Sequence, residues 1–290
     1  MPAPTFDLQS HSVHSDGALA PAEVVARGAA AGVRLLALSD HDSTAGVAEA
    51  AAAAAQKGIG LVPATEITSM YDGRQDLHVL GYLIDPGDAT LVTALQRSRN
   101  DRELRAEAMA DALRELGYAL DDAALAARAR EGKSIGRPHL AQAVVSVPEN
   151  RPRLEAEGLT DPTAFLVAYL IEGKPAFRDR SAPSVEEAIE LIHGAGGVAV
   201  WAHPFWDIAE PEDVLAAIER FRGAGLDGVE AFYVTHTEEQ TRLLVARCAE
   251  LGLLTTGSSD YHGPSHKTFS AFRAFDTFGL EPVLGPIAGA

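Results

Sequence analysis

Short apolar runs alternate with longer amphipathic runs along the first part of the chain. Residues 5–8 form an apolar run, and residues 21–32 follow with helical spacing, starting at a proline and ending at a glycine. Residues 35–38 are nearly all apolar, as in a strand buried on both faces. An alanine-rich stretch that reaches Lys57 then predicts a second helix.

Ser43 or Thr44 is the expected cap of this second helix. Residues 59–68 and 76–84 have the apolar composition of a third and a fourth strand. This alternation of strand and helix predicts a parallel sheet, most simply a closed α/β barrel with helices outside.

The alternation stops after the fourth strand. The pattern from 88 to 132 is long and helical, and helical runs at 135–145 and 165–173 continue it to about residue 180. We interpret this part as a helical insertion, or cap, over the carboxyl end of the sheet. The expected division is barrel 1–87, helical cap 88–180 and barrel 181–290.

Alternation resumes after the insertion. The expected elements are helix 185–197, strand 198–204, helix 212–225, strand 226–233, helix 236–252 and strand 253–260.

Composition limits the class of protein. The 290 residues are 47% apolar and 22% charged, and the formal net charge of −17 argues against nonspecific binding to duplex nucleic acid or anionic membrane. An anionic substrate stays open, because bound divalent cations can reverse the local field. Cys248, the single cysteine, is expected as a buried thiol. The start of the chain does not resemble a signal peptide or membrane span, so we expect a cytoplasmic protein. The sequence gives no sign of an obligate protein partner, and we expect none.

Side chains that bind metals lie near the ends of the apolar runs. These are His11, Asp16, His41, Glu66, His78, His203, Asp260 and His262. Because the carboxyl ends of barrel strands meet at one rim, we expect them to converge there. Imidazole and carboxylate together suit borderline divalent ions, and this set is large enough for two or three.

The motifs that carry these side chains resemble those of the PHP (polymerase and histidinol phosphatase) superfamily. They are SHSVHSDG, SDHD, TEIT, LHVLGY, AHP and GSSDYHG, with IGRPH inside the insertion. The branch they resemble most is that of nucleoside 3′,5′-bisphosphate phosphatases. The resemblance implies a distorted (β/α)7 TIM-like barrel that binds up to three divalent metals.

The resemblance also implies an assignment of ligands. Asp16, His41 and His262 would hold one metal, and His78 and His203 a second. Glu66 would bridge the second metal to a third, which His11 and Asp260 bind.

Gln9 departs from the family pattern, which begins with His-x-His where this chain has Gln9-Ser10-His11. A Gln carbonyl oxygen is a neutral, weaker ligand than imidazole. We therefore expect the Gln9/His11/Glu66/Asp260 site to be weak.

Paired divalent ions suit phosphate ester hydrolysis, because they acidify a bridging water and stabilise the attacking and leaving oxygens. Cationic side chains would position the phosphate. The substrate-binding candidates are Arg137, His139, Lys174, Arg178 and His236, of which the resemblance points to Arg137, His139 and His236 as catalytic. For Lys174 and Arg178 a solvated surface charge is the competing interpretation.

The sequence thus predicts a metal-dependent phosphoesterase that hydrolyses a phosphate monoester of a small nucleotide, of the 3′,5′-bisphosphate type. The cofactors would be two to three ions of manganese, zinc, iron or magnesium. The alternatives are a histidinol-phosphate phosphatase, a 5′-end oligonucleotide exonuclease, or a nucleotide-binding module with a degenerate metal centre. Phe205 or Trp206, which follow His203, are candidates to stack on a base.

Overall fold

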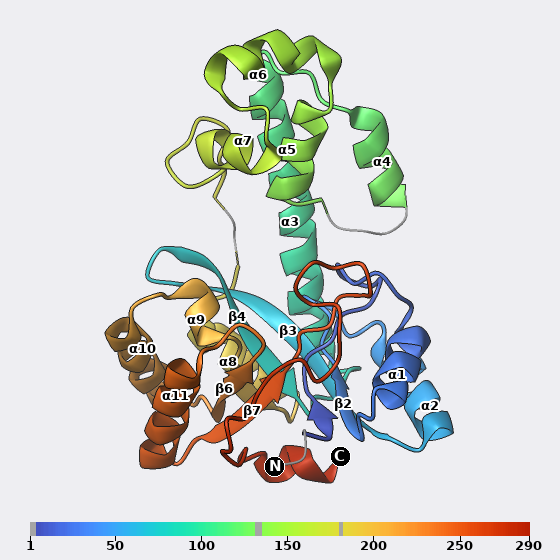
Figure 1. Ribbon diagram of the computed structural model, residues 1–290, viewed down its shortest axis with the longest axis vertical. Coiled ribbons are helices and arrows are strands. Elements are labelled where there is room, and N and C mark those ends of the chain that lie inside the picture. Colours follow the sequence, from blue (N-terminus) through green and yellow to red (C-terminus); the bar gives the residue numbers. More distant parts are fainter. Residues whose placement is uncertain (1–3, 131–134, 180–181) are drawn as a thin grey trace. The chain divides into compact units, whose positions relative to one another are not determined.

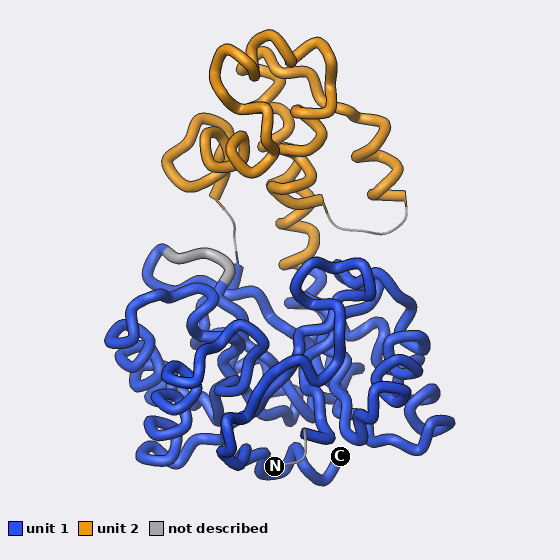
Figure 2. Tube along the Cα trace, in the orientation of Figure 1, with its two compact units in different colours: residues 1–96, 182–290 blue, residues 97–181 orange. Residues whose placement is uncertain are grey.

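The computed structural model describes residues 4–130, 135–179 and 182–290, with the backbone alone at 74–76. The chain forms two compact units (Figure 2). Unit 1 comprises Met1–Gln96 and Ala182–Ala290, and unit 2 comprises Arg97–Ser181.

Unit 1 is built on a seven-stranded sheet whose strands neighbour one another in chain order. The strands are β1 (Phe6–Asp7), β2 (Leu35–Leu38), β3 (Gly60–Tyr71), β4 (Arg74–Tyr82), β5 (Val198–Trp201), β6 (Gly228–Tyr233) and β7 (Leu254–Ser258). The last strand returns to the first, because the Leu8 amide donates to the Gly257 carbonyl at 3.2 Å and Ser10 bridges Tyr261 in parallel. The sheet is therefore a nearly closed barrel, which confirms the predicted α/β barrel.

Helices cover the outside of this barrel (Figure 1). They are α1 (Pro21–Ala30), α2 (Val47–Lys57), α8 (Val185–Gly194), α9 (Pro204–Asp207), α10 (Pro211–Gly223) and α11 (Glu238–Leu251), with the 3-10 turn Gly285–Gly289 near the end of the chain. Inside the barrel, Leu8, Val62, Leu80 and Val200 are fully buried and pack on one another. Cys248 is buried among apolar side chains, as the sequence predicts.

The sheet is not parallel throughout, contrary to the prediction. β4 runs antiparallel to both β3 and β5. Only Asp72 and Gly73 separate β3 from β4, and both have positive φ, 48° and 74°. A parallel crossover needs a dozen residues or more, so two residues permit only a hairpin. The reversal puts the first half of β4, which carries His78, at the rim where the parallel strands end.

The predicted cap of α2 is also wrong. The helix begins after Gly46, which offers no side chain as a cap. The Thr44 hydroxyl instead donates to the Pro86 carbonyl at 3.1 Å, and the Ser43 hydroxyl accepts from the Ala45 amide at 3.3 Å.

Unit 2 consists of helices and connecting loops, with no strand among its described residues. α3 (Ala89–Glu115) leads into it, followed by α4 (Asp122–Arg130), α5 (Arg137–Val145), η1 (Pro148–Asn150), α6 (Arg151–Glu157) and α7 (Pro162–Tyr169). It has its own core, in which Met109, Leu113, Tyr118, Leu140 and Phe165 are buried. The predicted division, with a helical insertion at 88–180, stays a prediction. Residue 132, the predicted end of its first helical run, and residue 180, its predicted last residue, lie outside the described residues, and its role as a cap also stays a prediction.

Asp7 links β1 to the segment after β7, at the seam where the barrel closes. Its fully buried carboxylate accepts hydrogen bonds from the Ser259 amide at 2.9 Å, the Ser259 hydroxyl at 2.6 Å and the Arg273 amide at 2.7 Å. We expect Asp7→Ala to lower the free energy of unfolding by at least about 2 kcal/mol, because buried donors lose their acceptor. Urea denaturation of the variant measures this loss.

The control for this prediction is Glu281→Ala, which removes an exposed carboxylate from the same unit. A midpoint for Asp7→Ala equal to that of the control would show that the seam does not depend on this carboxylate.

Candidate metal centre

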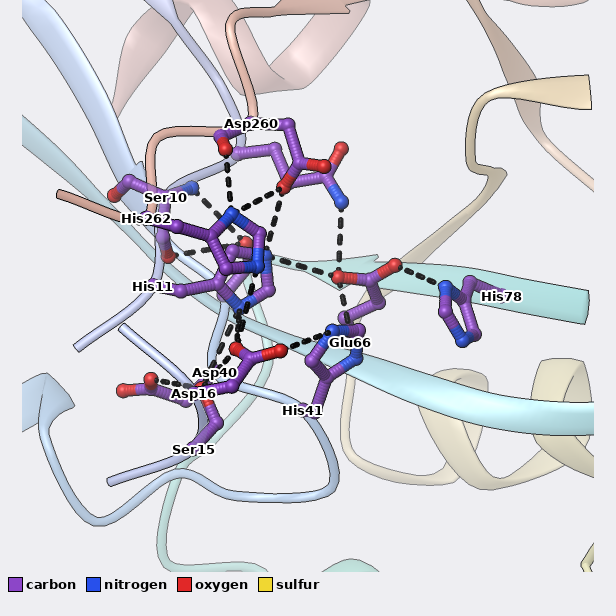
Figure 3. Close-up of polar contacts among 12 residues, drawn as sticks. Ser10, His11, Ser15, Asp16, Asp40, His41, Glu66, His78, Asp260 and His262 are labelled. Carbon is purple, nitrogen blue, oxygen red and sulfur yellow. Dashed lines mark hydrogen bonds and ion pairs between the residues drawn. The ribbon is translucent and has the colours of Figure 1, made fainter. Parts of the chain in front are cut away.

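The Glu66 carboxylate is the point on which the predicted ligands converge. Glu66 lies on β3, is fully buried, and sits between His11 and His78 (Figure 3). Its Oε1 is 2.7 Å from His78 Nδ1 and 3.1 Å from His203 Nε2. Its Oε2 is 3.2 Å from His11 Nε2 and 3.5 Å from His41 Nδ1. Four imidazoles from four segments of the chain therefore surround one carboxylate.

The electrostatics of this cluster suit metal ligands. Burial alone would raise the pKa of Glu66, but His41 and His78 outweigh it and hold the pKa well below its usual range. Burial lowers the pKa of His41 to about 4. Near neutral pH the Glu66 carboxylate is therefore charged and the His41 ring is neutral. Burial would lower the pKa of His11 and of His78, but Asp260 and Glu66 beside His11, and Glu66 beside His78, outweigh it and raise both pKa values, so these rings would release protons on binding a divalent ion.

The ligand atoms form three overlapping groups, within each of which all ligand atoms lie within 4.8 Å of one another. The groups are His11, Asp16, His41 and His262; His41, Glu66 and His78; and His11, Glu66 and Asp260. In the first group, Asp16 Oδ1 lies 3.3 Å from His262 Nε2, and the His11 and His262 rings stack at 4.3 Å. Shared members put the groups in contact, as a multinuclear centre requires.

Several buried nitrogen and oxygen atoms in these groups are better placed to bind a cation than to form hydrogen bonds with one another. His11 Nε2 lies 3.0 Å from Asp260 Oδ1, yet neither atom has an aligned hydrogen bond among the described residues. His41 Nδ1 is also buried and likewise has no aligned hydrogen bond among the described residues. Buried polar atoms are normally satisfied, so converging lone pairs of this kind are what metal coordination would complete.

The backbone around the cluster is strained where it presents ligands. Asp42, His203 and Asp260 adopt left-handed φ values of 49°, 29° and 52°. Such conformations cost about 1–3 kcal/mol each and collect at functional sites. Gly17 is required for a different reason, because a Cβ there would lie 2.2 Å from the His11 carbonyl oxygen. The turn after His11 can therefore fold back on it only with glycine at position 17.

Comparison with known proteins agrees with this geometry. No protein-family model matches the chain. A 3′,5′-nucleoside bisphosphate phosphatase of Chromobacterium violaceum is 35% identical, over 97% of this chain and 94% of that protein. A 5′-3′ exoribonuclease of Haemophilus influenzae is also 35% identical, over 89% of this chain and 90% of that protein. A solved structure named as a metal-dependent phosphoesterase of Bifidobacterium adolescentis superposes with a TM-score of 0.72. It is 30% identical and covers 92% of this chain and 91% of that one.

This chain belongs to the PHP family of metal-dependent phosphoesterases. The resemblance noted in its motifs is thereby confirmed, and so is its class as a phosphoric ester hydrolase. Among the described helices of this PHP protein, none has the length and apolar character needed to cross a membrane.

The groups bring together most of the side chains assigned to each metal of the PHP site, and their role as ligands stays a prediction. Asp16, His41 and His262 lie together, and so do Glu66, His11 and Asp260. Two side chains have a wider role than predicted, because His11 also reaches the first group and His41 also reaches Glu66 and His78. His203 Nε2 lies 3.4 Å from His78 Nδ1, next to the shared carboxylate. Which ion each group holds stays a prediction.

Gln9 is positioned differently from the prediction of an oxygen ligand. Its Nε2 donates to Glu66 Oε2 at 2.9 Å, and its Oε1 accepts from the Ser258 hydroxyl at 3.2 Å. The nitrogen has no lone pair for a cation, and the oxygen faces Ser258. In this orientation Gln9 positions Glu66, and its own role as a ligand stays a prediction.

The phosphate-binding candidates of unit 2 stay predictions. Arg137 and His139 lie in the first turn of α5, where His139 Nδ1 accepts from the Gly136 amide at 3.0 Å. Lys174 is exposed. The Arg178 guanidinium donates to the Phe177 carbonyl at 2.8 Å, so at least one of its N–H groups is used for a hydrogen bond within its own loop.

His236, a substrate-binding and catalytic candidate, is buried. Burial lowers its pKa to about 4, so the ring is neutral near neutral pH. Its Nδ1 lies 3.2 Å from the Ala231 carbonyl, which makes this nitrogen the donor and leaves Nε2 as an acceptor. A direct contact between His236 and substrate stays a prediction, with the ring accepting a hydrogen bond.

Sequence reasoning missed Asp40, which holds the first ligand loop. Its carboxylate accepts from the Ser12 amide and hydroxyl, both at 2.7 Å, and from the Ser15 hydroxyl at 2.6 Å. These bonds fix the segment between His11 and Asp16. Asp40 precedes His41 in the motif SDHD, so its position was visible but its partners were not.

Glu230 was missed as well, although a carboxylate inside the apolar run VEAFY is a visible signal. It is fully buried on β6, where Oε1 lies 2.6 Å from the Ser258 hydroxyl oxygen and Oε2 accepts from the His203 amide at 3.0 Å. Glu230 therefore positions both the His203 ligand and the serine that orients Gln9. Burial raises its pKa to about 8.

This raised pKa predicts a pH dependence of stability. The folded chain keeps a proton on Glu230 between pH 4.5, the ordinary value, and about 8, whereas the unfolded chain loses it. Stability should therefore fall as pH rises through this window. Glu230→Gln cannot ionise, so at pH 8.5 it should be more stable than the parent chain, by on the order of a few kcal/mol.

Thermal unfolding of metal-free protein at pH 5 and pH 8.5 measures the difference. Glu281→Gln, at an exposed position, is the control. If Glu230→Gln and the parent chain lose stability in parallel, Glu230 is ionised throughout and the assignment is wrong.

Proposed function

We propose that this PHP protein is a phosphatase that releases phosphate from a small nucleotide of the 3′,5′-bisphosphate type. One observation carries this proposal: the three ligand groups that share Glu66, His11 and His41. Such sharing suits two or three neighbouring ions that act on one phosphate group.

The residues of the chain would divide the work in a defined way. Bound divalent ions would supply Lewis-acid stabilisation and lower the pKa of a coordinated water. Glu66 provides the shared anionic charge, and the imidazoles around it would provide nitrogen donors, those with a raised pKa after loss of a proton. Asp40 and Glu230 hold the loops that carry them. The mixture of imidazole and carboxylate favours manganese, zinc or iron over magnesium, which prefers oxygen ligands.

The substrate class rests on the relatives. The bisphosphate phosphatase of C. violaceum aligns over nearly the whole chain, so both units have counterparts in it. A small, highly charged substrate also suits a protein with a net charge of −17, because the cations in the centre offset the repulsion that a long polyanion would meet elsewhere on the surface.

A second candidate is a 5′-3′ exoribonuclease that acts on short single strands. The observation that favours it is the H. influenzae relative, which is as similar in sequence as the phosphatase. Both activities break a P–O bond of a nucleotide, and they differ in whether the released product is inorganic phosphate or a mononucleotide.

A substrate screen with manganese-loaded protein separates the two. We expect adenosine 3′,5′-bisphosphate to release inorganic phosphate faster than AMP, histidinol phosphate or a 5′-phosphorylated RNA hexamer. Glu66→Gln should lower this rate by more than about 100-fold, because it removes the shared charge, whereas loss of a supporting partner typically costs 10–100-fold. Phosphate detection and chromatography of nucleotides measure both products.

Glu281→Gln is the matched control, since it makes the same chemical change on the surface. Mononucleotides released from the hexamer, without phosphate release from the bisphosphate, would replace the phosphatase proposal with the exoribonuclease.

The number of bound ions follows from Gln9. Because its amide N–H faces Glu66, the His11/Glu66/Asp260 group lacks the additional imidazole of the family pattern, and we expect about two firmly bound ions per chain. Gln9→His should raise the manganese content toward three. Elemental analysis after dialysis measures this directly.

Gln56→His is the control for adventitious binding, because it adds a histidine at an exposed position of α2. Equal metal content in Gln9→His and the parent chain would mean that position 9 does not limit the third site.

A further inference from the structure

Trp206 is unusual among the large apolar side chains of the described residues. It is 56% exposed, and the other exposed side chains of this kind are aliphatic. It lies on α9, three residues after the candidate ligand His203, and its amide donates to the His203 carbonyl at 2.8 Å. An exposed indole therefore lies in the turn that presents a ligand.

Two further rings hold this indole in place. The Trp206 ring packs against Phe269 at 5.6 Å between centroids and against Tyr233 at 6.4 Å. Phe269 and Tyr233 are both buried, so they support the indole from below while it stays open to solvent. We call Trp206, Tyr233 and Phe269 the aromatic shelf.

The aromatic shelf contacts the other side of the metal centre too. The Phe269 ring lies 5.4 Å from the His262 ring, and the Tyr233 hydroxyl donates to Asp260 Oδ2 at 2.8 Å. The shelf thus joins the turn after His203 to the segment that carries Asp260 and His262. A single ring, Tyr233 or Phe269, lies between the Trp206 indole and the candidate ligands Asp260 and His262.

The position of the aromatic shelf beside the candidate metal ligands indicates which chemical group it could bind. A single exposed apolar residue needs no explanation by itself, but an indole fixed by two buried rings beside ligand side chains presents a flat, rigid face next to the reaction centre. A nucleotide carries a flat base on one side of its sugar and phosphate on the other. Stacking does not distinguish bases strongly, since every base has a π face.

We propose that Trp206 stacks on the nucleobase of the substrate, so that the aromatic shelf makes the enzyme prefer phosphates that carry a base. This inference deepens the proposed function and rests on it, because it assumes that the substrate is a nucleotide. Trp206 acts in substrate binding, and Tyr233 and Phe269 position it.

Kinetics with and without a base test this role. We compare kcat/KM for adenosine 3′,5′-bisphosphate with kcat/KM for ribose 5-phosphate. Trp206→Ala should lower the ratio by about 5- to 100-fold, chiefly through KM for the nucleotide, as expected from loss of one stacking contact. Trp206→Phe should restore most of it. Val283→Ala, which truncates an apolar side chain of similar exposure (55%), should leave the ratio unchanged.

A ratio for Trp206→Ala within twofold of the parent value would overturn the proposal. This includes the case in which both substrates are affected equally, because that result indicates a purely structural role.

Fluorescence gives a readout that does not depend on turnover. Trp201 is fully buried, so Trp206 is the indole that a stacked base can quench. AMP should quench the emission of the parent chain but not that of Trp206→Phe, and ribose 5-phosphate should quench neither. An absence of quenching by AMP in the parent chain would refute the shelf.

The two experiments also separate this inference from the proposed function. If AMP quenches Trp206 but no nucleotide releases phosphate, the shelf binds a base and the phosphatase proposal is wrong. If phosphate is released from the bisphosphate but AMP does not quench Trp206, the phosphatase proposal holds and Trp206 does not stack on the base.

Discussion

The structure depends on keeping one carboxylate charged inside the protein. Glu66 is fully buried, and burial of an unpaired carboxylate would be costly enough to neutralise it. His11, His41, His78 and His203 approach it from four segments and keep its charge favourable. The barrel makes this possible, because strand ends far apart in sequence meet at one rim.

Other features serve that arrangement. Asp40, Asp7 and Glu230 are buried carboxyl groups that accept hydrogen bonds from ligand-bearing or neighbouring segments. They hold loops whose backbone is strained at His203 and Asp260. Strain of this kind persists only where surrounding contacts fix it, and here it fixes ligand direction. The site therefore depends on two sets of residues. One set is the candidate ligands, and the other is the buried carboxyl groups that hold the segments around them.

Much of this could be predicted from sequence, for a physical reason. Residues such as His41 and His203 follow short apolar runs, and the ends of such runs converge in a barrel. The direction of β4 was missed because apolar periodicity carries no information on direction, although the two-residue link at Asp72 and Gly73 does. The role of Gln9 could not be predicted, since its orientation depends on Ser258, 249 positions away.

The central claim is that Glu66 shares its carboxylate between ions. Anomalous diffraction from crystals of the manganese-loaded protein tests it most directly. At a manganese concentration high enough to fill the weak His11/Glu66/Asp260 group as well, the account predicts that two of the manganese ions lie at about 2.0–2.2 Å from different oxygens of Glu66, a normal metal–carboxylate distance. Manganese bound elsewhere, or bound to the histidines with Glu66 turned away, would contradict it.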